Sequence, residues 1–235
     1  MRLLTDSKPC KGSVCDMQLP TGAELRISGG EGPLAVVCMN GGQGAEVEGT
    51  WSATIEWLVT RLRPRFPELR FAELRYRIKS WQRLPWCMED ARAAIEETGG
   101  GRTALIGFSM GGAVAIGVAD EPSVETVVGL APWIPERLDL EPLRGRRLAV
   151  LQGSLDRGLP GIPGVAPRHS RAGFERVRAL GVEADYTLIP GAVHGLAVRP
   201  LGRALVPLPR AARWADLVAV ELERFRSGTE PQRPS

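Results

Sequence analysis

The chain has 235 residues, of which 43% are hydrophobic and 24% are charged, a balance typical of a soluble globular protein. Its net charge is only +3 and the basic residues are spread along the chain, which argues against a nucleic-acid partner. Neither a membrane span nor a secretory signal is recognisable, so we expect a cytoplasmic protein. The four cysteines form no C-x-x-C pair and lack nearby histidines, so we expect no metal site.

Apolar runs that predict buried strands alternate along the chain with segments that have apolar residues at helical spacing. The predicted strands span residues 34–39, 71–76, 103–108, 126–131, 147–152 and 184–189. The predicted helices span residues 51–63, 85–98, 113–119, 168–180 and 209–225. This alternation predicts an α/β fold, a mostly parallel central sheet with helices on both faces, formed by a single domain over residues 1–235. The polar ends, residues 1–12 and 227–235, are expected to be loose.

The segment that carries the strongest functional signal reads T-A-L-I-G-F-S-M-G-G over residues 103–112. Ser109 stands between Gly107 and Gly111 where the predicted strand turns into a helix. A serine at such a corner faces outward, and glycines are needed where the neighbouring chain would clash with side chains. Ser109 could instead be a simple helix N-cap, a position that serine favours.

Two further polar residues follow the ends of predicted strands, where ligands collect in a parallel sheet. Asp156 comes shortly after the strand ending at residue 152, and His194 after the strand ending at residue 189. A histidine can take the proton of a serine hydroxyl during attack, and a carboxylate can hold the imidazole in the required tautomer. Asp156 could also pair with Arg157 or act as a turn residue. The other histidine, His169, is expected on the surface of a helix.

This arrangement resembles the α/β-hydrolase family over about residues 34–225. The motifs that carry the resemblance are G-F-S-M-G at 107–111, G-S-L-D at 153–156 and G-A-V-H-G at 191–195. The resemblance implies that the serine, aspartate and histidine of these motifs are the nucleophile, the acid member and the base of a catalytic triad.

The resemblance also implies an oxyanion hole made of two backbone N–H groups. One belongs to Met110, directly after the serine at a helix N-terminus, where backbone donors are free. The other belongs to Gly42, with Gln43 as the alternative, in the loop after the first buried strand. Relatives often begin this loop with His-Gly, whereas this chain has Asn40-Gly41, so we expect the loop to be held differently.

A large lid does not fit this chain, because residues 132–146 form a short, proline-interrupted link between two strands. The chain is therefore most similar to the capless members of the family: dienelactone-hydrolase-like enzymes, carboxylesterases and thioesterases. We expect Gln43, Trp81 and Trp133 to border the substrate. The basic, tryptophan-containing loop 77–86 could recognise an acidic substrate, but a solvated loop whose tryptophans pack beneath it is favoured.

The resulting hypothesis is a serine hydrolase that cleaves a small ester or thioester through an acyl-serine, without metal or organic cofactor. Acyl transfer and peptide hydrolysis by the same residues are alternatives, as is a ligand-binding or scaffold protein that does not turn over. The hydroxyl of Ser109 should lie within hydrogen-bond reach of His194, beside a pocket that Trp133 leaves open. The sequence does not indicate the oligomeric state.

Overall fold

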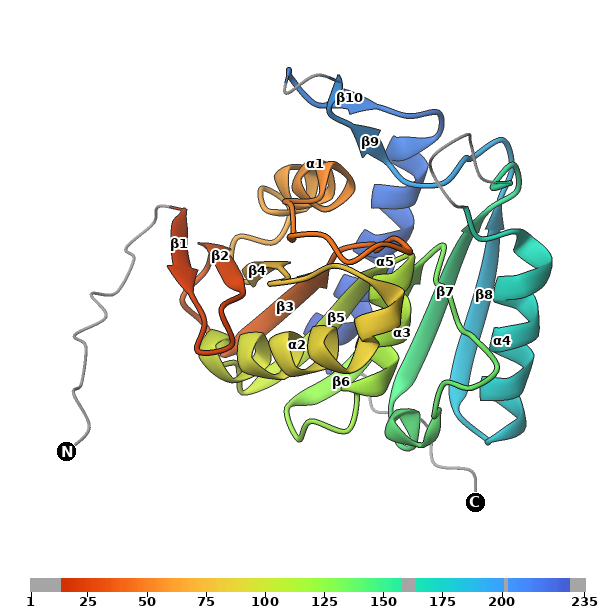
Figure 1. Ribbon diagram of the computed structural model, residues 1–235. Helices are drawn as coiled ribbons and strands as arrows, with labels where there is room; N and C mark the ends of the chain where they lie inside the picture. The colour runs from red at the N-terminus through yellow and green to blue at the C-terminus, as the bar shows by residue number, and fades with distance from the viewer. Residues whose placement is uncertain (1–13, 158–163, 201–202, 229–235) are drawn as a thin grey trace.

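An eight-stranded sheet forms the centre of the computed structural model, with helices packed on its two faces (Figure 1). The structure describes residues 14–157, 164–200 and 203–228. The strands of the sheet lie in the order β1-β2-β4-β3-β5-β6-β7-β8. Their bounds are β1 Cys15–Gln18, β2 Glu24–Gly29, β3 Leu34–Met39, β4 Arg70–Arg75, β5 Arg102–Phe108, β6 Val124–Leu130, β7 Arg147–Gly153 and β8 Glu183–Ile189.

The helices follow the strands in alternation, as the sequence predicts. Their bounds are α1 Ala53–Leu62, α2 Leu84–Thr98, α3 Met110–Gly117, α4 Pro167–Ala179 and α5 Ala211–Ser227, with the short 3-10 turns η1 Trp81–Arg83 and η2 Glu141–Leu143. Two short strands, β9 Ala197–Val198 and β10 Val206–Pro207, pair apart from the main sheet. Six adjacent strands run parallel to one another, in the order β4-β3-β5-β6-β7-β8. At the edge of the sheet, β2 is antiparallel to both β4 and β1.

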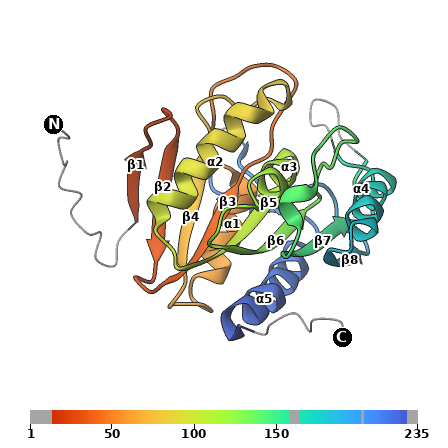
Figure 2. The ribbon, with the colours of Figure 1, turned by 90° about the horizontal axis from the view of Figure 1, so that it is seen from below.

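Apolar side chains fill both sides of the sheet, because successive residues of a strand point to opposite faces. In β3, Val37 belongs to the core beneath α2 and α3, whereas Val36 belongs to the core beneath α1 and α5. Figure 2 shows α2 and α5 on opposite sides of the sheet. The α/β fold with helices on both faces is therefore confirmed.

The sequence missed the two antiparallel strands at the edge of the sheet and the small pair formed by β9 and β10. β2 reads Glu-Leu-Arg-Ile-Ser-Gly and is only half buried, so it lacks the continuous apolar run of a central strand. The predicted helix at 113–119 begins three residues earlier, at Met110, because close packing against β3 overrides the low helix propensity of two glycines. Of the ends expected to be loose, 1–12 and 227–235, the described residues include only Ser227, which ends α5, and Gly228.

One carboxyl group is buried in this framework on the α1 side of the sheet. Glu73 lies in β4 opposite Cys38 of β3 and Arg26 of β2, and only 6% of it is exposed. Within the described part of the chain, its Oε2 atom has no hydrogen-bond partner. Burial raises the pKa of the Glu73 carboxyl to about 7, and the positive charge of Arg26 opposes that rise.

Candidate active site

Ser109 occupies a sharp corner between β5 and α3. Its backbone has φ 54° and ψ −116°, a left-handed conformation that a non-glycine residue adopts only when its surroundings enforce it. A Cβ atom on Gly107 would lie 2.3 Å from the carbonyl oxygen of Gly111, and one on Gly111 would lie 2.5 Å from that of Met39. The strand–turn–helix context expected around Ser109 is present, and its side chain makes no capping hydrogen bond.

Two loops that follow adjacent strands are joined by backbone contacts, and this brings Asp156 close to His194. The N–H of Leu155 donates to the carbonyl oxygen of Ala192 at 2.9 Å. Gly153 allows the loops to approach, because a Cβ there would lie 2.6 Å from the same oxygen. Asp156 and His194 are 38 residues apart in sequence, yet Oδ2 of Asp156 lies 2.7 Å from Nδ1 of His194.

The carboxylate of Asp156 is fully buried and has a complete set of partners. Oδ1 accepts a hydrogen bond from the backbone N–H of Val165 at 3.0 Å, and Oδ2 accepts one from Nε2 of Gln152 at 3.1 Å. Asp156 makes no ion pair with Arg157 among the described residues. Sequence reasoning missed Gln152 and Val165; the signal for the former was a polar residue at the end of an otherwise apolar strand.

The imidazole of His194 lies beside the serine corner, and 10% of its side chain is exposed. Its ring packs against that of Phe108, the residue before Ser109, with centroids 4.9 Å apart. Thr54 of α1 supports the loop by accepting a hydrogen bond from the backbone N–H of Leu196 at 3.1 Å. The expected hydrogen bond between Ser109 and His194, both of which the structure describes, is absent.

The two expected oxyanion donors come from segments that touch each other. A Cβ on Gly42 would lie 2.2 Å from Sδ of Met110, so the glycine backbone packs directly against that side chain. Met110 begins α3, where a backbone N–H has no partner within the helix. The segments expected to supply the two donors are therefore in contact.

The loop that contains Gly42 is held by Asn40. Oδ1 of Asn40 accepts the N–H of Gly41 at 2.7 Å, and its Nδ2 donates to the carbonyl oxygen of Thr50 at 2.9 Å. The amide thus fixes the loop at both ends. The carbonyl oxygen of Gln43 accepts the N–H of Trp81 at 3.1 Å, which ties the loop to η1.

A cavity of about 150 Å³ opens next to the serine; it is lined by Trp81, Ser109, Met110, Trp133, Gly164 and Val165. The rings of Trp81 and Trp133 lie 6.3 Å apart between centroids, with an interplanar angle of 46°. Trp133 donates its backbone N–H to the carbonyl oxygen of Ser109 at 2.9 Å. It therefore walls the cavity without filling it, whereas Gln43 is not among the lining residues.

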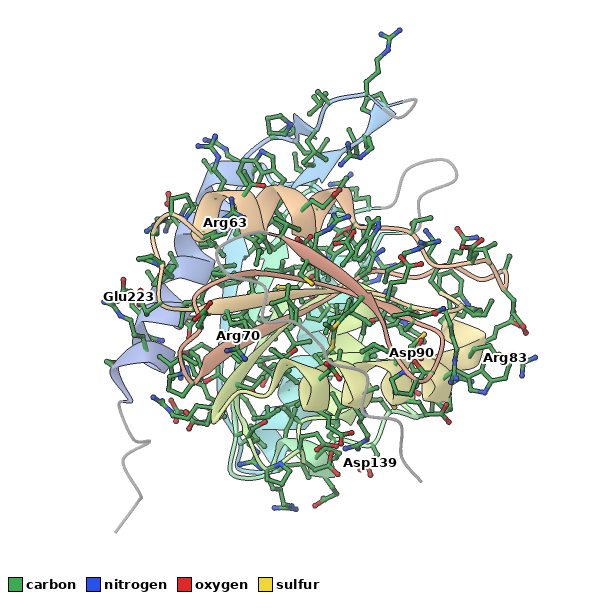
Figure 3. The ribbon with its side chains drawn as sticks, turned by 90° about the vertical axis from the view of Figure 1, so that its left-hand side faces the viewer. Arg63, Arg70, Arg83, Asp90, Asp139 and Glu223 are labelled. Carbon is green, nitrogen blue, oxygen red and sulfur yellow. The ribbon has the colours of Figure 1, made fainter. Side chains whose placement is uncertain are left out.

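Two arginines of the basic loop 77–86 form ion pairs within the protein. The side chain of Arg77 pairs with the buried Asp90 at 3.4 Å, and that of Arg83 pairs with Glu46 at 2.7 Å. Figure 3 shows Asp90 within the body of the molecule and Arg83 at its rim. These ion pairs agree with a structural role for the loop rather than with recognition of an acidic substrate. The expectation that its tryptophans pack beneath the loop is wrong for Trp86, which is 39% exposed and is covered by the guanidinium groups of Arg77 and Arg83.

The remaining expectations concern surface and metal chemistry. His169 is exposed at the start of α4, next to Arg168. Within the described ranges, no three histidine, cysteine, aspartate or glutamate side chains are grouped so that they could hold a metal ion. In the same part of the chain, no helix has the length and apolar character that crossing a membrane requires.

No protein-family model matches the sequence, and no curated protein is similar enough to count as a relative. Solved structures are similar in fold. The carboxylesterase Cest-2923 from Lactobacillus plantarum has a TM-score of 0.66 at 18% identity, over 94% of this chain and 100% of that one. A serine hydrolase without lid from Xanthomonas campestris has a TM-score of 0.63 at 15% identity, over 97% and 99% of the two chains.

An α/β hydrolase from a deep-sea metagenome library of the Medee basin has a TM-score of 0.66 at 17% identity, over 91% of this chain and 98% of that one. In the present chain, the link between β6 and β7 contains only the short turn η2, which leaves no room there for a helical lid. The chain therefore has the α/β-hydrolase fold.

Proposed function

We propose that the chain is a serine hydrolase that cleaves small esters or thioesters through an acyl-serine intermediate. The observation that supports this most is the 2.7 Å contact between buried Asp156 and His194, beside the corner that carries Ser109. A carboxylate, an imidazole and a hydroxyl that lines a cavity are the groups that nucleophilic catalysis by serine requires.

In the proposed reaction, Oγ of Ser109 attacks the carbonyl carbon of the substrate while Nε2 of His194 takes the hydroxyl proton. Asp156 holds the Nδ1–H of His194 and stabilises the imidazolium that forms. The N–H groups of Met110 and Gly42 donate to the oxyanion of the tetrahedral intermediate.

Collapse of that intermediate breaks the bond to the alcohol or thiol, which leaves with the proton from His194. A water molecule then attacks the acyl-serine, with His194 taking one of its protons. The second collapse releases the carboxylic acid and returns the proton to Ser109. No metal or organic cofactor takes part in this scheme.

The size and lining of the cavity favour a small acyl group. The volume of about 150 Å³ is small beside the roughly 300–1,000 Å³ that is usual for small-molecule sites. Trp81, Trp133 and Val165 offer apolar walls, and no charged side chain is among the lining residues that the structure describes. We therefore expect short, uncharged acyl chains to be preferred over long or acidic ones.

Ligand binding without turnover is the second candidate function. The absence of a hydrogen bond between Ser109 and His194 favours it, although catalytic hydrogen bonds are often loose until substrate binds. Acyl transfer or peptide hydrolysis would use the same three residues with another acceptor or acyl donor.

A fluorophosphonate probe, which reacts with activated serines, separates catalysis by Ser109 from ligand binding without turnover when intact mass is measured. We expect one adduct on the parent protein and one on the His169→Ala control, because His169 is exposed at the start of α4 and has no part in the proposed reaction. Ser109→Ala and His194→Ala should give none. Rates on p-nitrophenyl acetate and on a short acyl thioester would then give the substrate class. A folded parent that stays unlabelled would refute the hydrolase and support ligand binding.

A further inference from the structure

A buried glutamine lies behind the acid member of the proposed triad. Gln152, near the end of β7, is fully buried. Its Nε2 lies 3.1 Å from Oδ2 of Asp156 and 3.0 Å from the carbonyl oxygen of Val165, with the carbonyl oxygen of Gly153 farther away at 3.3 Å. The two N–H groups of the amide can therefore donate one hydrogen bond to the Asp156 carboxylate and one to the Val165 carbonyl oxygen.

The orientation of this amide follows from its neighbours. A flipped side chain would direct Oε1 at a carboxylate oxygen and a carbonyl oxygen, neither of which can donate a hydrogen bond. In the orientation present, Oε1 of Gln152 is buried and has no hydrogen-bond partner among the residues that the structure describes. A side chain that served packing alone would not leave a polar atom unsatisfied, because an apolar residue of the same size fills the space at lower cost.

The contacts around the carboxylate form a closed arrangement. The N–H of Val165 donates to Oδ1 of Asp156, and Gln152 binds both Oδ2 of Asp156 and the carbonyl oxygen of Val165. Gln152 thus holds Oδ2 of Asp156 directly, and it holds Val165, whose N–H donates to Oδ1. The plane of the carboxylate is set, and Oδ2 is directed at Nδ1 of His194.

We propose that Gln152 is a positioning residue that acts through Asp156, a role that rests on the proposed function. It holds the carboxylate in the plane that orients His194 and does not itself touch substrate. If the amide of Gln152 were removed, Asp156 would keep two hydrogen-bond donors, the N–H of Val165 and Nδ1 of His194. The N–H of Val165 would then be less firmly held, because the contact of Gln152 with the Val165 carbonyl oxygen would be lost as well.

The test compares Gln152→Met, which keeps the length and loses the N–H groups, with Gln152→Asn, which keeps a shorter amide. Thr103→Val is the matched control, because it also removes a buried polar group but lies far from the candidate site. Thr103 is fully buried near the start of β5, whereas Ser109 follows the end of that strand, and the hydroxyl of Thr103 donates a hydrogen bond to that of Ser123. The rate of fluorophosphonate labelling is measured against probe concentration, so that the bond-forming rate constant is separated from probe affinity.

We expect Gln152→Met to lower the rate constant about tenfold or more, since a hydrogen bond to a charged group is lost. Probe affinity should change by less than about threefold, because Gln152 is not a lining residue of the cavity. Gln152→Asn should recover part of the rate, and Thr103→Val should lower stability alone. Labelling of Gln152→Met at the parent rate would overturn the proposal.

A second readout does not depend on activity. The chain has only two histidines, so the Nδ1 proton of His194 can be identified by NMR of ¹⁵N-histidine protein with the His169→Ala variant as reference. Held on Asp156, this proton should exchange slowly in the parent and faster in Gln152→Met. An unlabelled parent would refute the proposed function alone, whereas an unchanged proton signal in Gln152→Met would refute the role of Gln152.

Discussion

Replacing the buried Glu73 by glutamine should make the protein more stable at alkaline pH. The pKa of this carboxyl rises from 4.5 to about 7, chiefly because burial disfavours the charged form. The folded protein therefore keeps the proton up to about pH 7, whereas the unfolded chain releases it near 4.5. Since the unfolded state binds fewer protons in this interval, the free energy of unfolding falls as the pH rises through it.

The magnitude follows from the same pKa values. Each pKa unit corresponds to ~1.4 kcal/mol, so ionising Glu73 in the folded state costs about 3 kcal/mol above pH 7. Glutamine has nearly the shape of the protonated acid and cannot ionise. Glu73→Gln should thus match the parent near pH 4.5 and exceed it by about 3 kcal/mol near pH 8.5.

Urea unfolding followed by tryptophan fluorescence, at intervals between pH 4.5 and 8.5, measures this difference. Titration of all other groups cancels when the variant is subtracted from the parent. Glu48→Gln is the control, because the side chain of Glu48 is 80% exposed. If the difference in free energy of unfolding between Glu73→Gln and the parent were independent of pH, ionisation of the buried Glu73 carboxyl would not destabilise the folded state, and the reasoning would be refuted.

Three other substitutions test the site. Gly111→Ala should destabilise the fold by several kcal/mol or abolish it, since its Cβ would lie 2.5 Å from the Met39 carbonyl oxygen; circular dichroism and thermal unfolding would detect this, and a stable variant would contradict it. Asn40→Ala removes the acceptor of the Gly41 N–H and so loosens the loop that carries Gly42. It should lower kcat about tenfold with KM little changed, and an unaltered kcat in steady-state assays would contradict a role for this loop. Trp133→Ala enlarges the cavity and should shift ester preference toward longer acyl chains, measured on p-nitrophenyl esters of increasing length; an unchanged preference would show that this tryptophan does not limit acyl size.

The central strands and the serine corner could be predicted because their signals are local. An apolar run of six or seven residues specifies a buried strand without reference to the rest of the chain. The glycines around Ser109 report a close approach that any side chain would prevent. Both features are properties of short segments, and the structure has them within a few residues of the predicted bounds.

The edge of the sheet could not be predicted in the same way. Arg26 in β2 bonds Asp16 of β1 at 2.9 Å and Glu56 of α1 at 3.1 Å. Its charge is acceptable in a strand only because partners from two other elements surround it. Such partners are defined by tertiary contacts, which the pattern of a single segment does not contain.

The same limit applies inside the candidate site. The sequence identified Asp156 and His194 from their positions after strands, but not Gln152, whose importance depends on which atoms face its amide. The absent hydrogen bond between Ser109 and His194 depends on side-chain rotamers. A pattern of residue types carries no information on either.

The cavity and the serine corner differ in how freely mutation can change them. At Gly107 and Gly111 any side chain would meet backbone atoms, so the corner offers almost no viable substitutions. Trp81, Trp133 and Val165 come from three separate loops, after β4, β6 and β7. The rings of Trp81 and Trp133 face each other, so these two walls have to be varied together, whereas Val165 can be varied separately. Laboratory evolution of the proposed hydrolase can therefore confine its libraries to these walls and leave the serine corner unchanged.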